Sequence, residues 1–423
     1  MFIREVTPRM IRDSRGERTI EIELDSYEGN FKCSAPTGKS RGRSEVEPWS
    51  SRGIEHSLKM LKVFCRSLKY RNFMIKKVDD LKEVVELMRK FEVRDGQFGG
   101  NVNYVVEGVF LKAAAAWRRK ELWEFINDDV NDGLKPKMPM PVGNCIGGGL
   151  HSKLIKGKRP DFQEFLLIPK EKSFARAVTL NLRAYEYAKK FLTSLRRCQA
   201  SGVRRQESRI RGMLRGTERD DEGAWMTRKT NEEVLEILQK LGKKFGVRIG
   251  VDFAAATFYD KGYYIYKNKN LVRDKVDQAD YVERLVKKFG IFYVEDAMNE
   301  SDFSGFAEIT NNVSKQTLVV GDDLTTTNLK LVRRAVEGKV INAMIVKPNQ
   351  IGSILEVKKV VEFCKKNKIV MIFSHRSGET MDDILADYCV GFGGQFIKCG
   401  IWGRERLIKL KRVMEIERTL MRS

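Results

Sequence analysis

The chain has 423 residues, and 42% of them are hydrophobic, which allows two domains or one barrel with an appended domain. It has no run of eighteen apolar residues, and its N-terminal segment MFIREVTPRMIRDSRG lacks an apolar centre. The sequence therefore predicts neither a membrane span nor a signal peptide, and it favours a cytoplasmic protein. The net charge of +22 favours anionic partners, and seven cysteines without a CxxC pair argue against a disulfide framework or a zinc site.

The first 135 residues carry the signals of a small α+β domain. The segment IEIELDSYEGNFKCSAP alternates apolar and polar residues around Gly29, which is typical of a β-hairpin. Two later segments, VDDLKEVVELMRKFEV and VVEGVFLKAAAAWRRKELWEFIND, have apolar residues at helical spacing. We therefore expect residues 1–135 to form a capping domain of antiparallel strands and helices.

The proline-rich segment KPKMPMPVGN, residues 135–144, predicts a domain boundary. Beyond it, strand signals alternate with amphipathic helical segments such as ILEVKKVVEFCKKN and RERLIKLKRVMEIERTL. This repetition predicts an α/β fold, a (β/α)8-type barrel over residues 136–423. A doubly wound open sheet is the alternative, but it would need a glycine-rich phosphate turn, and CIGGGLHS matches that turn poorly.

The densest basic segment covers residues 196–219 and has eight arginines against two glutamates. It contains no aromatic residue, so it lacks the stacking platform of a single-strand nucleic-acid binder. We favour a solvated loop over a nucleic-acid footprint.

Six short apolar runs in the second half of the chain each end on a residue that can do chemistry. They are RIGVD, IFYVE, LVVGD, AMIVK, VMIFSH and QFIK, and their last residues are Asp252, Glu295, Asp322, Lys347, His375 and Lys398, at intervals of 43, 27, 25, 28 and 23 residues. A single polar residue at a strand end often marks only the return of the chain to water. Six in register, however, predict an active site, because the strands of such a barrel end at one mouth. Three carboxylates there suit Mg2+, and the lysines suit proton abstraction or charge stabilisation.

Seven motifs spread over nearly the whole chain resemble those of the enolase family. IRDSRGERTIEIE resembles DSRGNPTVEV, IGGGLHS resembles INGGSHA, FQEFLLIP resembles MQEFMILP, and DDEGAW resembles GDEGGF. In addition, VVGDDLTTTN is similar to VGDDLTVTN, VKPNQIGS is similar to KxNQIGT, and SHRSGET is unchanged from the family's phosphate-site signature. This resemblance implies an enolase-type barrel with an N-terminal domain, a hydro-lyase of glycolysis and gluconeogenesis, and reversible dehydration of 2-phosphoglycerate to phosphoenolpyruvate.

The resemblance also implies roles for individual residues. The tightly held Mg2+ would be bound by Asp252, Glu295 and Asp322, and a second Mg2+ by Ser40 in the loop APTGKSRG. Lys347 would remove the proton from C2 of 2-phosphoglycerate, and Glu222 would protonate the departing C3 hydroxyl.

The remaining implied contacts surround the substrate. Glu164 would stand beside Glu222, and Lys398 would face the substrate carboxylate. The phosphate and neighbouring oxygens would be held or lined by His151, His375, Arg376 and Ser377. Family members are generally dimers, so we expect a homodimer or a higher homo-oligomer.

Four segments depart from the family pattern. The loop SGAST becomes TGKSR, which places Lys39 and Arg41 on either side of Ser40 and predicts weaker binding of the second Mg2+. The asparagine and serine of the INGGSHA loop become Gly147 and Leu150, and GAPxRSER becomes the shorter GIWGRER. The basic segment 196–219 precedes Glu222. Two other functions therefore stay open, namely a related enzyme that forms a metal-bound enolate from another phosphorylated acid, and a non-catalytic protein that binds nucleic acid or protein.

Overall fold

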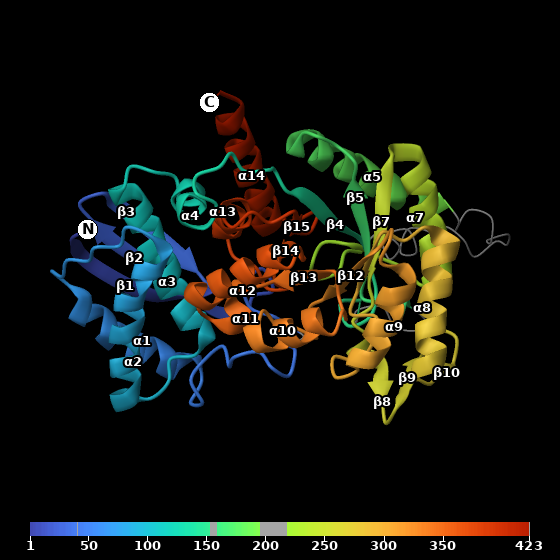
Figure 1. Cartoon of the computed structure of the whole chain (residues 1–423), viewed down its shortest axis with the longest axis horizontal. Coiled ribbons are helices and arrows are strands. Elements are labelled where there is room, and N and C mark those ends of the chain that lie inside the picture. Colours follow the sequence, from blue (N-terminus) through green and yellow to red (C-terminus); the bar gives the residue numbers. More distant parts are fainter. Residues whose placement is uncertain (40, 153–158, 195–217, 423) are drawn as a thin grey trace, which may run out of the picture.

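A computed structural model describes residues 1–39, 41–152, 159–194 and 218–422 of the chain (Figure 1). Its N-terminal part is a three-stranded antiparallel sheet with helices packed against it. The strands are β1 (Ile3–Arg12), β2 (Arg18–Ser26) and β3 (Gly29–Ser34). The predicted hairpin joins β2 to β3, and Gly29 at its turn has a φ of 133°, a conformation that favours glycine.

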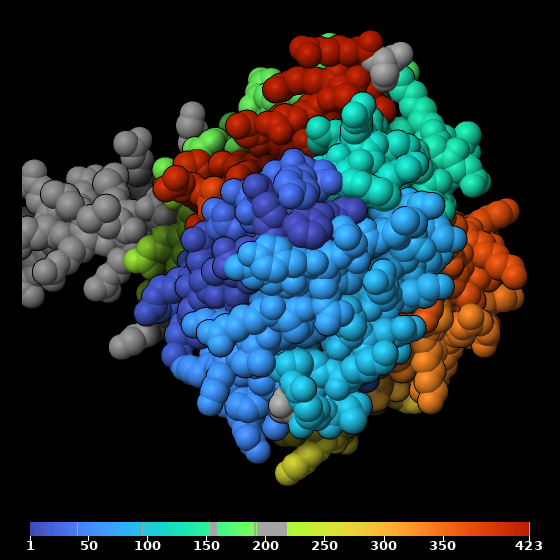
Figure 2. Space-filling model, turned by 90° about the vertical axis from the view of Figure 1, so that its left-hand side faces the viewer, coloured from blue at the N-terminus to red at the C-terminus, as the bar shows by residue number. Residues whose placement is uncertain are grey.

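The helices of the N-terminal part cover the apolar face of this sheet. They are α1 (Ile54–Leu68), the short 3-10 turn η1 (Val78–Leu81), α2 (Lys82–Asp95), α3 (Gly100–Trp117) and α4 (Leu122–Val130). Alternation along β2 buries Ile20, Ile22 and Leu24 completely, and α3 contacts both β2 and β3. In the view of Figure 2 this part of the chain forms the near face of the molecule.

The remainder of the chain forms a closed barrel of eight strands, which confirms the predicted fold class. The strands are β4 (Met140–Gly147), β5 (Glu164–Pro169), β7 (Val247–Asp252), β11 (Tyr293–Glu295), β12 (Leu318–Gly321), β13 (Ala343–Val346), β14 (Val370–Ser374) and β15 (Phe396–Lys398). Pairing of β15 with β4 closes the ring, and the short strand β6 (Trp225–Met226) adds to β4 from outside it. All six apolar runs singled out in the sequence are barrel strands.

Helices surround the barrel (Figure 1). They are α5 (Phe174–Ser194), α7 (Asn231–Phe245), α8 (Lys275–Phe289), α9 (Phe303–Val313), α10 (Leu329–Glu337), α11 (Pro348–Ile351), α12 (Ile354–Lys366), α13 (Ile384–Gly391) and α14 (Arg404–Arg422). A small sheet of β8 (Tyr259–Asp260), β9 (Tyr263–Tyr266) and β10 (Leu271–Arg273) follows the turn η2 (Ala255–Phe258). No helix among these described segments is long and apolar enough to cross a membrane.

The helix boundaries follow local signals. Thr230 accepts a hydrogen bond from the Glu233 N–H at the start of α7, and Glu233 answers with its side chain, which makes a capping box. The same helix ends at Gly246, whose left-handed conformation (φ 67°) closes the last turn. Residues within or next to α7 therefore determine where this helix begins and ends.

One strand departs from the expected all-parallel arrangement. β5 runs antiparallel to both β4 and β7, whereas the other neighbouring pairs of barrel strands, from β7 and β11 round to β15 and β4, are parallel. A parallel pair needs a crossover connection, usually a helix. The described residues between β4 and β5, 148–152 and 159–163, contain none. As a result Glu164, the first residue of β5, lies at the same end of the barrel as Asp252, the last residue of β7.

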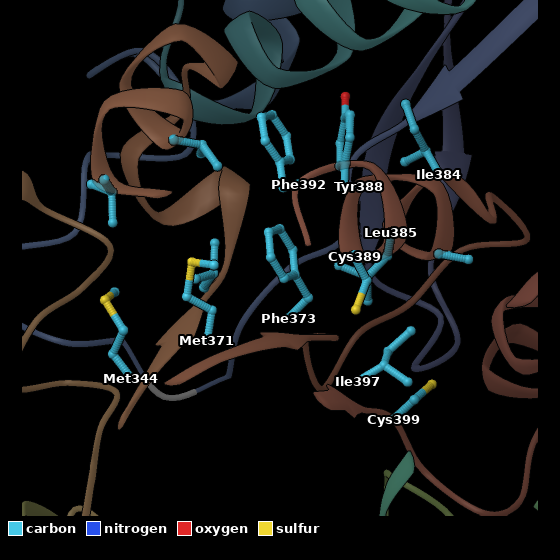
Figure 3. Packing of buried hydrophobic residues seen from close by; sticks show 14 of the residues in the cluster. Met344, Met371, Phe373, Ile384, Leu385, Tyr388, Cys389, Phe392, Ile397 and Cys399 are labelled. Carbon is cyan, nitrogen blue, oxygen red and sulfur yellow. The ribbon is translucent and has the colours of Figure 1, made fainter. Parts of the chain in front are cut away.

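Two apolar clusters hold the barrel. Along β13, Ala343 and Ile345 belong to one cluster with residues of the other barrel strands, whereas Met344 and Val346 belong to the second. This alternation is expected for a strand buried on both faces. Figure 3 shows the second cluster between strands and helices, where Phe373 stacks on Phe392 (ring centroids 6.0 Å apart). This packing fixes the strands whose ends carry the candidate site.

Candidate active site

An open cavity with about 450 Å³ of empty space lies at the mouth of the barrel. It is lined mainly by charged and polar side chains from the ends of many strands. The predicted site residues that line it are His151, Glu164, Glu222, Asp252, Asp322, Lys347, His375, Arg376, Ser377 and Lys398. Glu295 lies beneath them and contacts Lys398, while Ser40 lies outside the described residues. Sheet closure thus brings together residues that are far apart in sequence.

Lys398 is buried at the centre of three carboxylates. Its Nζ lies 3.0 Å from Glu164 Oε2, 3.0 Å from Asp252 Oδ2 and 2.8 Å from Glu295 Oε2. These acids sit side by side because Glu164 and Glu295 are the register partners of Asp252 on the strands to either side of it. Burial lowers the pKa of Lys398, but the three carboxylates outweigh burial and hold it well above its usual value. Lys398 is therefore a fixed positive charge.

Lys347 forms an ion pair with Asp322, the residue that follows the neighbouring strand. Asp322 also accepts a hydrogen bond from Gln350 Nε2 at 3.0 Å. Burial lowers the pKa of Lys347, the carboxylate of Asp322 raises it, and the net shift is upward. Arg376 and Lys398 oppose the effect of Asp322.

Two carboxylates at the mouth were not identified from the sequence. Asp296 and Asp323, each next to a predicted ligand, form a close group with Asp322. Asp296 has a φ of 42° and accepts the backbone N–H groups of Asp322 (3.0 Å) and Asp323 (2.7 Å). Burial and repulsion by Asp322 raise the pKa of Asp323 to about 8. A signal for both was present in the sequence, because each directly follows a predicted strand-end acid, Asp296 in VED and Asp323 in GDD.

The donor set at this mouth fits a divalent cation. Among the residues that the structure describes, five buried or half-buried carboxylates face two lysines, Lys347 and Lys398. The acids are Asp252, Glu295, Asp296, Asp322 and Asp323. Burial and mutual repulsion hold the pKa values of Glu295 and Asp296 well above the usual range. Because Mg2+ prefers carboxylate oxygens, it would relieve this repulsion. Within the described residues, Asp322 groups more tightly with Asp296 and Asp323 than with Asp252 and Glu295.

The opposite side of the cavity carries His151, Glu164 and Glu222. His151 Nδ1 lies 2.6 Å from Asp221 Oδ1 and 3.8 Å from Glu222 Oε1. Burial lowers the pKa of His151, but Glu222 and Asp221 outweigh burial and raise it to about 10. His151 is therefore a cation that donates to Asp221.

Glu164 and Glu222 lie close together beside His151, with side-chain atoms of all three within 4.8 Å of one another. Burial raises the pKa of Glu164 to about 7, with Lys398 opposing the shift and Glu222 adding to it. Burial also raises the pKa of Glu222, but His151 and the hydrogen bond from Glu164 outweigh burial, so the net shift is downward. The two shifts run in opposite directions, so Glu164 holds a proton more strongly than Glu222 does.

SHRSGET supplies a neutral histidine beside a buried arginine. Burial and the surrounding cations hold the pKa of His375 well below its usual value, and His375 Nε2 lies 3.7 Å from Glu222 Oε2. Arg376 donates to both carboxylate oxygens of Glu45 (2.9 and 3.1 Å) and to Asn349 Oδ1 (3.2 Å). Ser377 Oγ accepts hydrogen bonds from the Lys39 N–H at 2.8 Å and from Arg15 Nη1 at 3.2 Å. Sequence reasoning missed Glu45 and Arg15, although Arg15 belongs to the DSRG motif.

The loop that begins at Thr37 lies over this mouth. Thr37 exchanges two backbone hydrogen bonds with Gly378, and a side chain at Gly38 would overlap with the guanidinium of Arg376. Lys39 Nζ lies 2.7 Å from Asp221 Oδ2, and Arg41 Nη1 lies 3.1 Å from Glu47 Oε2. Both cations expected beside the second metal are therefore paired with carboxylates of the protein.

Comparison with known proteins points to one family. Residues 135–423 match the family model described as enolase, C-terminal TIM barrel domain. The enolase of Thermoplasma acidophilum is 34% identical to this chain, and the match covers 99% of the chain and 98% of the relative. The enolases of Methanosphaera stadtmanae and Archaeoglobus fulgidus are each 32% identical, and each match covers 99% of the chain and 97% of the relative.

Proposed function

The chain belongs to the enolase family, and we propose how the residues at its barrel mouth divide the work of the reaction. The enzyme is a hydro-lyase that interconverts 2-phosphoglycerate and phosphoenolpyruvate. The observation that carries the proposal is the meeting, in one cavity, of a largely buried lysine, a close pair of carboxyl groups and an excess of buried carboxylates.

Lys347 is the base that removes the proton from C2. This proton lies next to a carboxylate and is a very weak acid, because its loss creates a dianionic enolate. Mg2+ held by Asp252, Glu295 and Asp322 would supply positive charge that stabilises this enolate. Lys347 must lose its own proton first, and the cations Arg376 and Lys398 favour that loss because they repel its ammonium group.

Glu222 delivers the proton to the departing C3 hydroxyl, and Glu164 holds that proton in reserve. The two carboxyl groups lie close enough for a proton to pass between them inside the buried site, without crossing bulk water. His151 stays cationic beside Glu222 and stabilises the carboxylate that remains after transfer.

Substrate oxygens are held by the cations on the two remaining sides of the cavity. Arg376 and Ser377 bind the phosphate, for which Arg376 exchanges its contact with Glu45. Lys398 faces the substrate carboxylate and supports the enolate that forms there. His375, which is neutral, lines the site and hydrogen bonds to substrate oxygens.

Asp252, Glu295 and Asp322 would hold one Mg2+, with Asp296 and Asp323 adjoining them. A second Mg2+ would bind on the side of the substrate loop, with Ser40 as one ligand. We further propose that residues 1–135 form the capping domain and residues 136–423 the catalytic barrel, since the first barrel strand begins at Met140. A cytoplasmic homodimer or higher homo-oligomer, acting in glycolysis and gluconeogenesis, is the expected setting.

The direct test is an absorbance assay on purified protein with Mg2+ and 2-phosphoglycerate. We expect ultraviolet absorbance to rise as phosphoenolpyruvate forms, and the rise to stop when EDTA is added. Turnover of another phosphorylated acid in place of 2-phosphoglycerate would assign the site to a related enolate-forming reaction. A folded, Mg2+-saturated protein that turns over none of these acids would instead support a binding protein.

A further inference from the structure

The turn that carries Glu222 is a tight bend between Glu218 and Met226. The Met226 N–H donates to the Glu218 carbonyl at 3.0 Å, and the Asp220 N–H donates to the Ala224 carbonyl at 2.9 Å. Asp220 also closes the bend from inside, because its Oδ1 accepts the N–H groups of Glu222 (3.0 Å) and Ala224 (2.9 Å). The backbone at Glu222 is therefore held in place by one carboxylate oxygen, Asp220 Oδ1.

In the family pattern, the space that the Asp220 side chain occupies here would be filled by the asparagine at position 147. The sequence has DDEGAW where the family has GDEGGF, and IGGG where the family has INGG. Asp220 thus replaces a glycine, and Gly147 replaces an asparagine. A Cβ built on Gly147 would overlap with Asp220 Oδ2, and no other atom comes nearly as close to it. A side chain at 147 and a carboxylate at 220 exclude each other.

Asp220 is not an ordinary surface acid. It is 8% exposed, and its Oδ2 has no hydrogen-bond partner among the described residues. Leaving such a buried oxygen without a hydrogen-bond donor destabilises the fold. The useful part of this buried carboxylate is therefore its other oxygen, Oδ1, which holds the bend through two backbone hydrogen bonds.

We propose that Asp220 is a positioning residue for Glu222. Its buried carboxylate, on the same turn as Glu222, takes the place of the asparagine side chain that the family has at position 147, on the neighbouring loop. The inference rests on the proposed role of Glu222 as the acid. In the described part of the chain, Asp220 forms no hydrogen bond or ion pair with Lys347 or with a predicted metal ligand, and its Oδ1 holds the backbone of Glu222 and Ala224. Its loss should therefore disturb the acid half of the reaction and spare the base half.

The test separates these halves. Exchange of the C2 proton with solvent, followed by NMR in D2O, reports the base, and phosphoenolpyruvate formation reports the complete reaction. We expect Asp220→Ala to lower kcat for dehydration about tenfold or more, which corresponds to about 1.4 kcal/mol, with KM and C2 exchange within about twofold of wild type. Asp220→Asn keeps an oxygen acceptor of the same shape, so it should stay within about threefold of wild type.

A reciprocal pair of variants keeps the idea testable if Asp220→Ala does not fold. Gly147→Asn alone should behave like Asp220→Ala, because the added side chain displaces the carboxylate. Combining Gly147→Asn with Asp220→Gly restores the family pair and should recover most of the lost dehydration rate. A double variant no better than either single change would contradict the exchange of space between the two positions.

Glu417→Ala is the matched structural control. Glu417 is also buried and accepts two backbone N–H groups, those of Phe174 (2.6 Å) and Ala175 (3.0 Å), at the start of α5. It should lower the melting temperature without separating exchange from dehydration. Equal losses of exchange and dehydration in Asp220→Ala would overturn the proposal. Glu222→Gln should block dehydration and retain exchange of the C2 proton. Loss of exchange in this variant would show that the assigned role of Glu222 is wrong as well, so the two proposals can fail separately.

Discussion

At the scale of single residues, the barrel mouth contains more buried negative charge than its lysines neutralise. Lys398 touches three carboxylates and Lys347 touches one. Removing one partner of a buried ion pair is costly, because it leaves the other charge unpaired. Variants at the mouth must therefore be compared with a buried lysine that plays no part in the chemistry.

Lys347→Ala should abolish exchange of the C2 proton, by at least about a hundredfold, because it removes the base. Substrate binding, measured by calorimetry, should change much less, since Arg376, Ser377 and Lys398 remain in place. Lys358→Ala is the control. Lys358 is also largely enclosed and pairs with Asp79 (2.6 Å) and Asp129 (2.9 Å), so its loss should lower stability while exchange continues. Retained exchange in Lys347→Ala would move the base to another residue.

At the scale of elements, the substrate loop is tied to the acid turn. Lys39 reaches Asp221, which in turn accepts from His151. The change from SGAST to TGKSR predicted an effect of Lys39 on the second metal. In the structure Lys39 pairs with Asp221, and this ion pair links two segments that both face the substrate. The loop and the acid turn should therefore close together.

Lys39→Ala is expected to raise KM about threefold and to leave the Mg2+ activation curve nearly unchanged. The pair is partly exposed, with side-chain exposures of 31% and 16%, and such pairs contribute at most about 1 kcal/mol. Arg41→Ala serves as the control, because Arg41 pairs with the exposed Glu47 and should leave KM unchanged. Activation at clearly lower Mg2+ in Lys39→Ala would show that the charge of Lys39 does act on a metal.

The helix α12 is capped by a residue from another element. Ser353, the residue that precedes this helix at the N-cap position, forms no capping hydrogen bond with its own side chain. Glu107 of α3 accepts the Ile354 N–H at 2.7 Å and the Ser353 hydroxyl at 3.3 Å. Burial raises the pKa of Glu107 to about 7, although these hydrogen bonds oppose the shift. The cap therefore joins the N-terminal part to the barrel and carries a pH dependence.

The sign of this dependence follows from the raised pKa. Glu107 favours folding fully below its unfolded value of about 4.5 and loses that contribution as pH rises through about 7. Glu107→Gln should therefore gain stability relative to wild type between pH 5 and pH 8, by up to about 3 kcal/mol. Urea unfolding at the two pH values measures the change, and Glu308→Gln, at an exposed position, controls for surface charge. A constant difference between wild type and Glu107→Gln would contradict the assignment.

At the scale of the whole molecule, a strongly basic chain encloses an acidic centre. The net charge is +22, yet the carboxylates of the mouth are buried and repel one another. The N-terminal part closes over this centre through Asn349, which donates to the Pro36 carbonyl at 3.0 Å and to Asn101 Oδ1 at 3.1 Å. Stability and metal binding are thus expected to be coupled.

Mg2+ should raise the thermal midpoint of unfolding, because it binds the folded mouth and not the unfolded chain. At one hundred times its dissociation constant, the gain is about 2.7 kcal/mol. Asp322→Asn should remove most of this shift. Asp382→Asn, at a buried carboxylate that pairs with Lys112 outside the mouth (2.8 Å), should lower the midpoint and keep the shift. An equal shift with NaCl at matched ionic strength would point to screening instead of binding.

The sequence alone determined which residues stand at the strand ends. Six apolar runs and their last residues are local features, since a buried strand requires continuous apolar residues and its end is marked by the return of polar ones. The closed barrel and the family followed from these runs and from motifs such as SHRSGET. The hairpin at Gly29 and the ends of α7 were equally local.

Only the tertiary structure decided which side chains meet. The reversed direction of β5 placed Glu164 beside Asp252, and the left-handed backbone of Asp296 turned its carboxylate toward the group around Asp322. The pairing of Lys39 with Asp221 and the exclusion between Asp220 and position 147 join segments distant in sequence. Such contacts depend on chain direction, turn conformation and the closing of the sheet, and no local pattern of residue types encodes these distances.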